Sequence, residues 1–121
     1  MNLNIKTTNI SLTPETKEYL ERKLMMLEKI IDFNKDNVFA QVELGKTTMH
    51  HKQGDIFRAE INLRINGNSF RAVREEEDLY AAIDGMKDEI NREVKNGKEK
   101  RISIVRRGGQ RLKRFLHLDR D

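Results

Sequence analysis

Four stretches of the chain alternate apolar and polar positions, a pattern typical of strands with one buried face. They span residues 3–7, 38–44, 57–65 and 69–74. The pair Asn66-Gly67 separates the last two stretches, and it is a strong hairpin signal because both residues can adopt positive φ. The polar residues 45–55 predict a loop between the second and third strands.

An amphipathic helix is predicted after the first strand. Its apolar stripe, at three- and four-residue spacing, is Leu20, Leu24, Leu27 and Ile31. We expect this helix to begin at Thr13-Pro14-Glu15. Thr13 can cap free backbone amides, Pro14 suits the first helical position, and Glu15 is favoured at the positive end of the helix dipole.

A second amphipathic helix is predicted after the fourth strand, where an acidic run covers residues 75–78. Its apolar stripe is Leu79, Ile83, Met86, Ile90 and Val94. The pair Asn96-Gly97 predicts the end of the helix, because glycine tolerates the left-handed conformation of a C-terminal cap.

This order of elements predicts an α+β domain of the form β-α-β-β-β-α. Since each helix has one apolar stripe and each strand one apolar face, both helices should cover one face of a four-stranded sheet. The first helix would connect parallel strands by a right-handed crossover, and the last three strands would form an antiparallel meander. The other sheet face should meet water, and it would carry Arg58, Glu60, Asn62 and Arg64.

The composition is that of a single small domain. The chain has 121 residues and no cysteine, so neither a disulfide framework nor a thiolate metal site is possible. No stretch approaches the roughly 20 apolar residues that span a membrane, and the start of the chain lacks the pattern of a secretory signal. We therefore expect a soluble, cytoplasmic protein with no membrane partner.

The positive charge is concentrated at one end of the chain. The net charge is +7 from Lys95 onward and −3 over residues 1–94. Such asymmetry favours a polyanion-binding end on an otherwise ordinary domain, and a solvated tail that aids solubility is the alternative.

Enzymatic and cofactor chemistry has little support in the residues. No phosphate-binding glycine loop follows a strand, and no pair of carboxylates lies in a predictable cleft. His50-His51, with Asp55 nearby, could at most form a weak metal site, and an ordinary exposed loop is the favoured interpretation. We expect no catalytic residue, no cofactor, no metal and no small-molecule substrate.

Basic residues on the two helices could instead line one groove for a phosphate backbone. The candidate phosphate-binding residues are Lys17, Lys23, Lys87, Arg92, Lys95, Lys98, Lys100 and Arg101. Glu89 and Glu93 lie among them and could form ordinary ion pairs on an exposed helix surface.

A basic tail follows the predicted domain, which covers residues 1–101, and occupies residues 102–121. It has too little apolar surface to fold alone, so we expect it to be flexible until phosphates or a protein groove hold it. Its candidate RNA-binding residues are Arg106, Arg107, Arg111, Lys113 and Arg114. Phe115 could stack on an unpaired base, or pack with Leu112 and Leu116 against this domain or a partner.

Two stretches carry a resemblance to a known family. They are "DLYAAIDGMKDEINREVKNGKEK", residues 78–100, and "MNLNIKTTNISLTPETKEYLERKLMMLEK", residues 1–29. Both resemble the bacterial ribosome hibernation factors, the hibernation-promoting factor and ribosome-associated inhibitor family. The likeness covers nearly all of residues 1–101.

The resemblance implies a fold like that of double-stranded RNA-binding domains and binding to rRNA in the decoding channel of the small ribosomal subunit. The positions that match the family's basic residues are Lys17, Lys23, Arg92, Lys98 and Lys100. Tyr80 and Asp84 match the signature too, with Tyr80 packing near the helix start and Asp84 structural or solvent-facing. Glu89 and Asn96 stand where members often have basic residues. The family's long form has a second domain that we expect this chain to lack, and the basic tail is not explained by the resemblance.

The function that follows is a non-enzymatic translation inhibitor of non-growing cells, in the stress response and stationary phase. It would bind the small subunit and the intact ribosome, and would block mRNA and tRNA binding by occupancy alone. A general double-stranded RNA binder and a protein-interaction module with an acidic partner are the alternatives.

Overall fold

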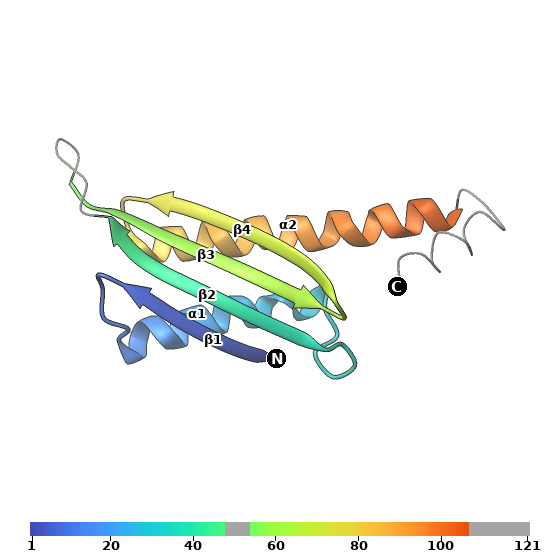
Figure 1. The fold of residues 1–121 in the computed structure, drawn as a ribbon, viewed down its shortest axis with the longest axis horizontal. Coiled ribbons are helices and arrows are strands. Elements are labelled where there is room, and N and C mark those ends of the chain that lie inside the picture. Colours follow the sequence, from blue (N-terminus) through green and yellow to red (C-terminus); the bar gives the residue numbers. More distant parts are fainter. Residues whose placement is uncertain (48–53, 107–121) are drawn as a thin grey trace.

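The computed structural model describes residues 1–47 and 54–106, of which residues 99–106 are described by their backbone alone. Its strands are β1 (Asn2–Thr8), β2 (Val38–Thr47), β3 (Ile56–Ile65) and β4 (Asn68–Glu76). Its helices are α1 (Pro14–Met25), the short 3-10 helix η1 (Met26–Lys29) and α2 (Leu79–Arg106). The predicted α+β class and element order are confirmed, and Figure 1 shows α1 and α2 on the same side of the sheet.

The four strands form one sheet in the order β1-β2-β3-β4. The strands β1 and β2 are parallel, with Leu3 opposite Ala40, and the other two neighbouring pairs are antiparallel. The hairpin between β3 and β4 turns at Asn66 and Gly67, whose φ angles are 51° and 87°. The predicted parallel crossover, meander and turn are therefore all present.

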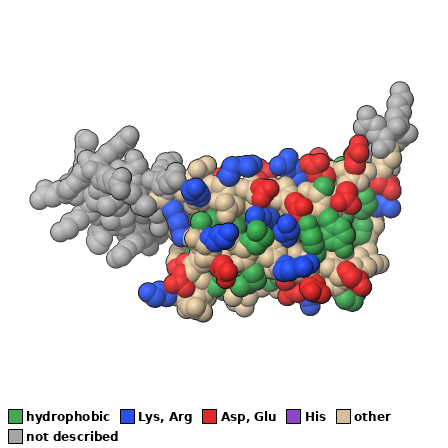
Figure 2. Space-filling model, turned by 180° about the vertical axis from the view of Figure 1, so that it is seen from behind, with side chains coloured by type: hydrophobic (Ala, Val, Ile, Leu, Met, Phe, Trp, Pro, Cys, Tyr) green, Lys and Arg blue, Asp and Glu red, His purple; other side chains and the backbone are tan. Residues whose placement is uncertain are grey.

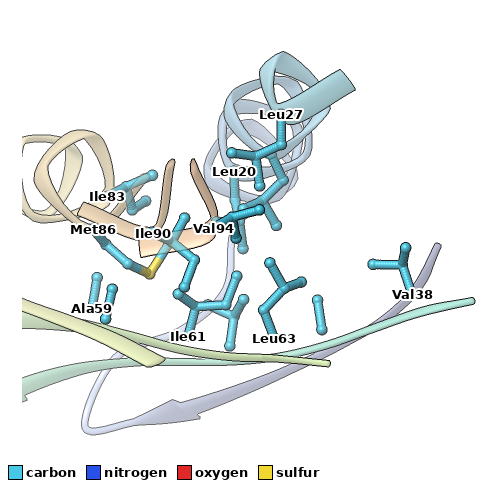
Figure 3. Close-up of a cluster of buried hydrophobic side chains, with 14 of the residues drawn as sticks. Leu20, Leu27, Val38, Ala59, Ile61, Leu63, Ile83, Met86, Ile90 and Val94 are labelled. Atoms are coloured by element: carbon cyan, nitrogen blue, oxygen red, sulfur yellow. The ribbon is translucent and has the colours of Figure 1, made fainter. Parts of the chain in front are cut away.

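A single apolar core lies between the helices and the sheet (Figure 3). The stripe residues of both helices point toward the inward-facing residues of the strands, as their periodicity predicts. The side chains that are fully buried include Leu20, Leu24, Leu27, Ile61, Leu63, Ile83, Met86 and Ile90. This packing holds α1 and α2 in a fixed position relative to each other.

Both long helices begin with a side-chain cap. Thr13 has extended backbone angles, and its Oγ1 accepts a hydrogen bond from the backbone N–H of Thr16 at 3.2 Å, with Pro14 at the first helical position. At the start of α2, Asp78 Oδ2 accepts a bond from the backbone N–H of Ala81 at 3.0 Å. The predicted start of α1 is thus confirmed in its chemistry, whereas α2 begins with a cap by Asp78 and has no acidic residue in its first turn.

The predicted end of α2 at Asn96-Gly97 is wrong, because the helix continues to Arg106. Gly97 lies where α2 crosses β4, and a Cβ at that position would come within 2.8 Å of Cε1 of Phe70. The glycine therefore permits close packing of the helix on the sheet, rather than ending the helix.

Two further boundaries differ from the sequence prediction. The loop predicted over residues 45–55 begins later, because β2 continues to Thr47 and pairs there with Ile56. The first helix is regular only to Met25, and the chain then tightens into η1. Ile31 is nonetheless buried, as its place in the stripe predicts.

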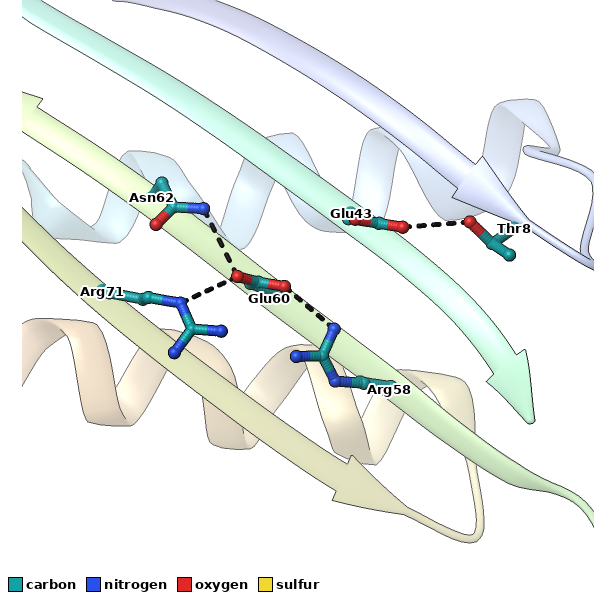
Figure 4. Close-up of polar contacts among 6 residues, drawn as sticks. All are labelled: Thr8, Glu43, Arg58, Glu60, Asn62 and Arg71. Atoms are coloured by element: carbon teal, nitrogen blue, oxygen red, sulfur yellow. Dashed lines mark hydrogen bonds and ion pairs between the residues drawn. The ribbon is translucent and has the colours of Figure 1, made fainter. Parts of the chain in front are cut away.

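The sheet face away from the helices carries an ion-pair network (Figure 4). Glu60 Oε1 accepts a bond from Arg58 Nη1 at 2.9 Å, and Glu60 Oε2 accepts one from Arg71 Nε at 2.8 Å. The Glu60 side chain is only 14% exposed, so the prediction that Glu60 simply faces water is wrong. Burial raises the pKa of Glu60, but the hydrogen bonds from Arg71 and Arg58 outweigh it and bring the pKa below its ordinary value of 4.5.

This network predicts an acid-sensitive contribution to stability. Because the pKa of Glu60 is lower in the folded chain than in the unfolded chain, its stabilisation is present above the ordinary pKa and is lost as the pH falls through the folded value. We expect Glu60→Gln to cost about 1 kcal/mol at pH 7 and to lessen the loss of stability upon acidification. Urea unfolding between neutral and acidic pH measures both effects. Glu21→Gln, the same change at an exposed site on α1, should leave the acid dependence as in the wild type.

Candidate nucleic-acid interface

The face formed by α1 and α2 carries several of the basic residues singled out in the sequence. Figure 2 shows this side of the molecule, with Lys and Arg side chains across its middle and Asp and Glu side chains among them. The electrostatic character of the face therefore depends on which of these charges pair within the protein.

Five side chains join the two helices in one polar and aromatic cluster. From α1, Tyr19 Oη donates a hydrogen bond to Asp84 Oδ1 on α2 at 2.5 Å, and Lys23 Nζ lies 3.2 Å from the same oxygen. The rings of Tyr19 and Tyr80 meet edge to face, with centroids 4.5 Å apart. The Tyr80 hydroxyl also lies 3.4 Å from Thr16 Oγ1. Tyr80 thus packs near the start of α2, and Asp84 has the structural role that the sequence left open.

This cluster sets the charge state of Lys23. Its hydrogen bond to Asp84 raises the pKa of Lys23, and the bond to the same carboxylate raises the pKa of Tyr19. Lys23 therefore stays protonated, but Asp84 partly neutralises it. The two side chains are 29% and 44% exposed, so a polyanion can still approach them.

Three lysines of α2 continue from this cluster along the side of the helix that faces α1. Lys87, Lys95 and Lys98 follow Asp84 at three, eleven and fourteen residues, spacings that keep side chains near one side of a helix. Lys98 Nζ donates to the backbone carbonyl of Ile30 at the end of η1, which places it directly between the two helical segments. We call Lys23, Lys87, Lys95 and Lys98 the interhelix seam.

The seam residues differ in their freedom. Lys87 is restrained by its surroundings. Its side chain is only 16% exposed, and its Nζ lies 3.2 Å from Asp88 Oδ1. Lys95, and Arg92 three residues before it, are exposed and form no side-chain hydrogen bond or ion pair with any residue that the structure describes. These two cations are available to an external anion without breaking an internal contact.

The structure does not gather all the predicted residues. Lys17 is exposed on α1, but it is six residues before Lys23 and so lies about 120° around the helix, away from the seam. Lys100, Arg101 and Arg106 belong to α2 by their backbone. The other predicted tail residues, Arg107, Arg111, Lys113 and Arg114, lie outside the described residues.

One residue of this face was missed in the sequence. Arg22 is exposed, and its guanidinium carbon lies 5.8 Å from the centroid of the Tyr19 ring, with Lys23 Nζ at 5.3 Å from the same centroid. The spacing in the sequence could have predicted this contact, because residues three and four positions after a tyrosine are its neighbours on a helix and a cation there can lie over the ring.

No other type of site competes with this surface in the described part of the chain. No three metal-ligating side chains gather within residues 1–47 and 54–106. Asp55 pairs with Lys46 at 3.2 Å, whereas His50, His51 and His117 lie outside the described ranges. None of the helices in these ranges combines the length and apolar character needed to cross a bilayer.

Comparisons with known proteins agree with the resemblance noted in the sequence. The model of the family described as sigma 54 modulation protein / S30EA ribosomal protein matches residues 3–102. The ribosome hibernation promoting factor of Klebsiella oxytoca is 32% identical over 100 residues, which are 83% of this chain and 96% of the relative. That of Azotobacter vinelandii is 32% identical over 111 residues, 92% of this chain and 94% of the relative.

A solved structure gives the same result for the fold. The crystal structure of the N-terminal domain of Protein Y from Thermus thermophilus superimposes with a TM-score of 0.66 at 29% identity, over 79% of this chain and 98% of that one. The family model, the relatives and the fold all point the same way, and the chain belongs to the sigma 54 modulation protein / S30EA ribosomal protein family.

Proposed function

We propose that this chain is a cytoplasmic ribosome hibernation factor that binds rRNA of the small subunit in the decoding channel and thereby blocks mRNA and tRNA. Membership of the family carries the general part of this proposal, a ribosome-associated role in hibernation rather than an enzymatic one. The interhelix seam carries the specific part.

The seam supports an RNA ligand because of how its cations are arranged. Packing of two rigid helices on one core fixes the seam lysines along a line, as a phosphate backbone requires. Lys95 of the seam and the neighbouring Arg92 have no partner in the described part of the chain, so phosphates can contact them without a cost in broken ion pairs.

Inhibition by this mechanism needs no catalysed reaction. A folded domain seated in the channel that mRNA and the anticodon arms of tRNA use would exclude both by occupancy. Because the contacts are electrostatic, the affinity should fall steeply with salt, by about 0.7 to 0.9 logarithmic units per phosphate contact and decade of salt concentration.

The test removes the positive charges of Arg92 and Lys95, which are exposed, and leaves the buried core residues unchanged. We expect Arg92→Ala combined with Lys95→Ala to weaken co-sedimentation with the small subunit and to lower the salt slope by about 1.5. Lys6→Ala with Lys35→Ala removes the same charge from exposed positions on β1 and on the turn before β2, and should change ribosome binding less. Equal losses from both pairs would contradict a localised interface.

A competition experiment separates the proposal from its alternatives. If the chain binds specifically in the decoding channel, excess RNA duplex should fail to displace it from small subunits. A general double-stranded RNA binder would instead move from the subunits to the duplex. A chain that stays on ribosomes while mRNA and tRNA still bind would contradict the blocking mechanism.

A further inference from the structure

The sheet face away from the helices has an unexplained exposed aromatic ring. Phe39 on β2 is 43% exposed, whereas its neighbours Val38 and Ala40 are buried on the helix side. Burying a phenylalanine side chain is worth roughly 1.5–3 kcal/mol, so this ring forgoes a stabilising position. Phe39 lines a shallow hollow of about 570 Å³ at one end of the open sheet face.

The strand register surrounds Phe39 with hydrogen-bond donors. Two neighbouring rows of side chains cross all four strands at this end of the face. The row of the ring contains Asn2, Phe39, Arg64 and Ser69. The next row contains Asn4, Gln41, Asn62 and Arg71.

Acidic groups are absent from these two rows and concentrated beyond them. The third row contains Glu43 and Glu60 beside Lys6, and the fourth contains Glu75 beside Arg58, so neither row has a net positive charge. Glu60 accepts hydrogen bonds from Arg71 and Asn62 of the second row (Figure 4). Arg64, in contrast, is exposed and pairs with no residue in the described ranges. The open face is therefore polarised, with its positive end at the aromatic ring.

An aromatic ring, amides and arginines together match a nucleobase and its phosphate. The ring offers a stacking platform, amide groups can bond base edges, and an unpaired guanidinium can bond a phosphate. A duplex hides its bases, so the fitting ligand is a single strand. We propose that this end of the open sheet face binds an unpaired base of single-stranded RNA on Phe39, with Arg64 on the adjacent phosphate.

This site goes beyond the proposed function, because it lies across the sheet from the interhelix seam (Figure 1). A chain seated on rRNA through its helices would present this face outward, where a single strand could bind it. The proposal can be tested without ribosomes, so its result is independent of the sedimentation experiments.

The main test measures binding of the full chain to a fluorescein-labelled single-stranded RNA of about ten nucleotides, by anisotropy. We expect Phe39→Ala to weaken binding about tenfold, as loss of one stacked base would, and Phe39→Leu to weaken it similarly. The leucine variant keeps an apolar side chain that fits a strand, so a loss shared by both variants reports the missing ring. Binding by both variants within about twofold of the wild type would overturn the proposal.

A second measurement locates the RNA. The chain has no tryptophan, so Phe39→Trp creates a single reporter that can still stack. Its fluorescence should be quenched by the single strand and not by the same strand in a duplex. Met25→Trp, on the helix side, is the matched control, since Met25 is 46% exposed. Equal quenching at both positions, or quenching at the Met25 position alone, would also overturn the proposal.

Discussion

A chain that ends at Arg106 is expected to bind ribosomes about a hundredfold more weakly than the full chain at moderate salt. This truncation keeps every residue that the structure assigns to α2, Leu79–Arg106. It removes five basic residues, Arg107, Arg111, Lys113, Arg114 and Arg120. If each contacts a phosphate, the logarithmic salt slope should fall by about 3.5 to 4.5. Ribosome sedimentation over a range of salt concentrations gives both numbers.

Two variants of the full-length chain show which property of the tail matters. Replacing the five basic residues by glutamine keeps the length and the apolar residues, and should reproduce the truncation if charge dominates. Phe115→Ala keeps the charge, and a large loss there would instead favour stacking or docking of the tail. A truncated chain with an unchanged salt slope would remove the tail from the mechanism.

The second large effect concerns the core that fixes the interhelix seam. Ile90 is fully buried and lies between α2 and the sheet, near Ile61 (Figure 3). We expect Ile90→Ala to lower the free energy of unfolding by about 2 to 5 kcal/mol, from lost burial and the cavity left behind. This is a large fraction of the roughly 5–15 kcal/mol that is typical of small domains. Urea denaturation measures the change.

A matched control separates burial from helix propensity. Met26→Ala removes an apolar side chain that is 42% exposed, at a helical position outside the core, and should cost much less than Ile90→Ala. At temperatures where Ile90→Ala remains folded, its ribosome binding should be close to that of the wild type, because no seam lysine has changed. Loss of binding in a fully folded variant would mean that Ile90 acts on the interface by another route.

Much of the candidate site could be predicted because its residues lie on regular helices. Lys87 and Lys95 share a side of α2 by spacing alone, whereas Lys98 joins them only because the helix continues beyond its predicted end at Gly97. The cluster around Asp84 could not be predicted in the same way, since Tyr19 and Asp84 are separated by 65 positions and meet only through helix packing. Its effect on Lys23, a cation partly neutralised in place, follows from that long-range contact.

Local periodicity was sufficient for the strands, the helix starts, the Asn66-Gly67 turn and the identity of the core. Each of these depends on residues a few positions apart, whose propensities agree with one another. Packing between distant elements decided the rest. Gly97 has the conformational freedom to end a helix, but its place against Phe70 made it a site of close approach within α2. The register of four strands likewise paired Glu60 with two arginines and left Phe39 and Arg64 side by side on the open face.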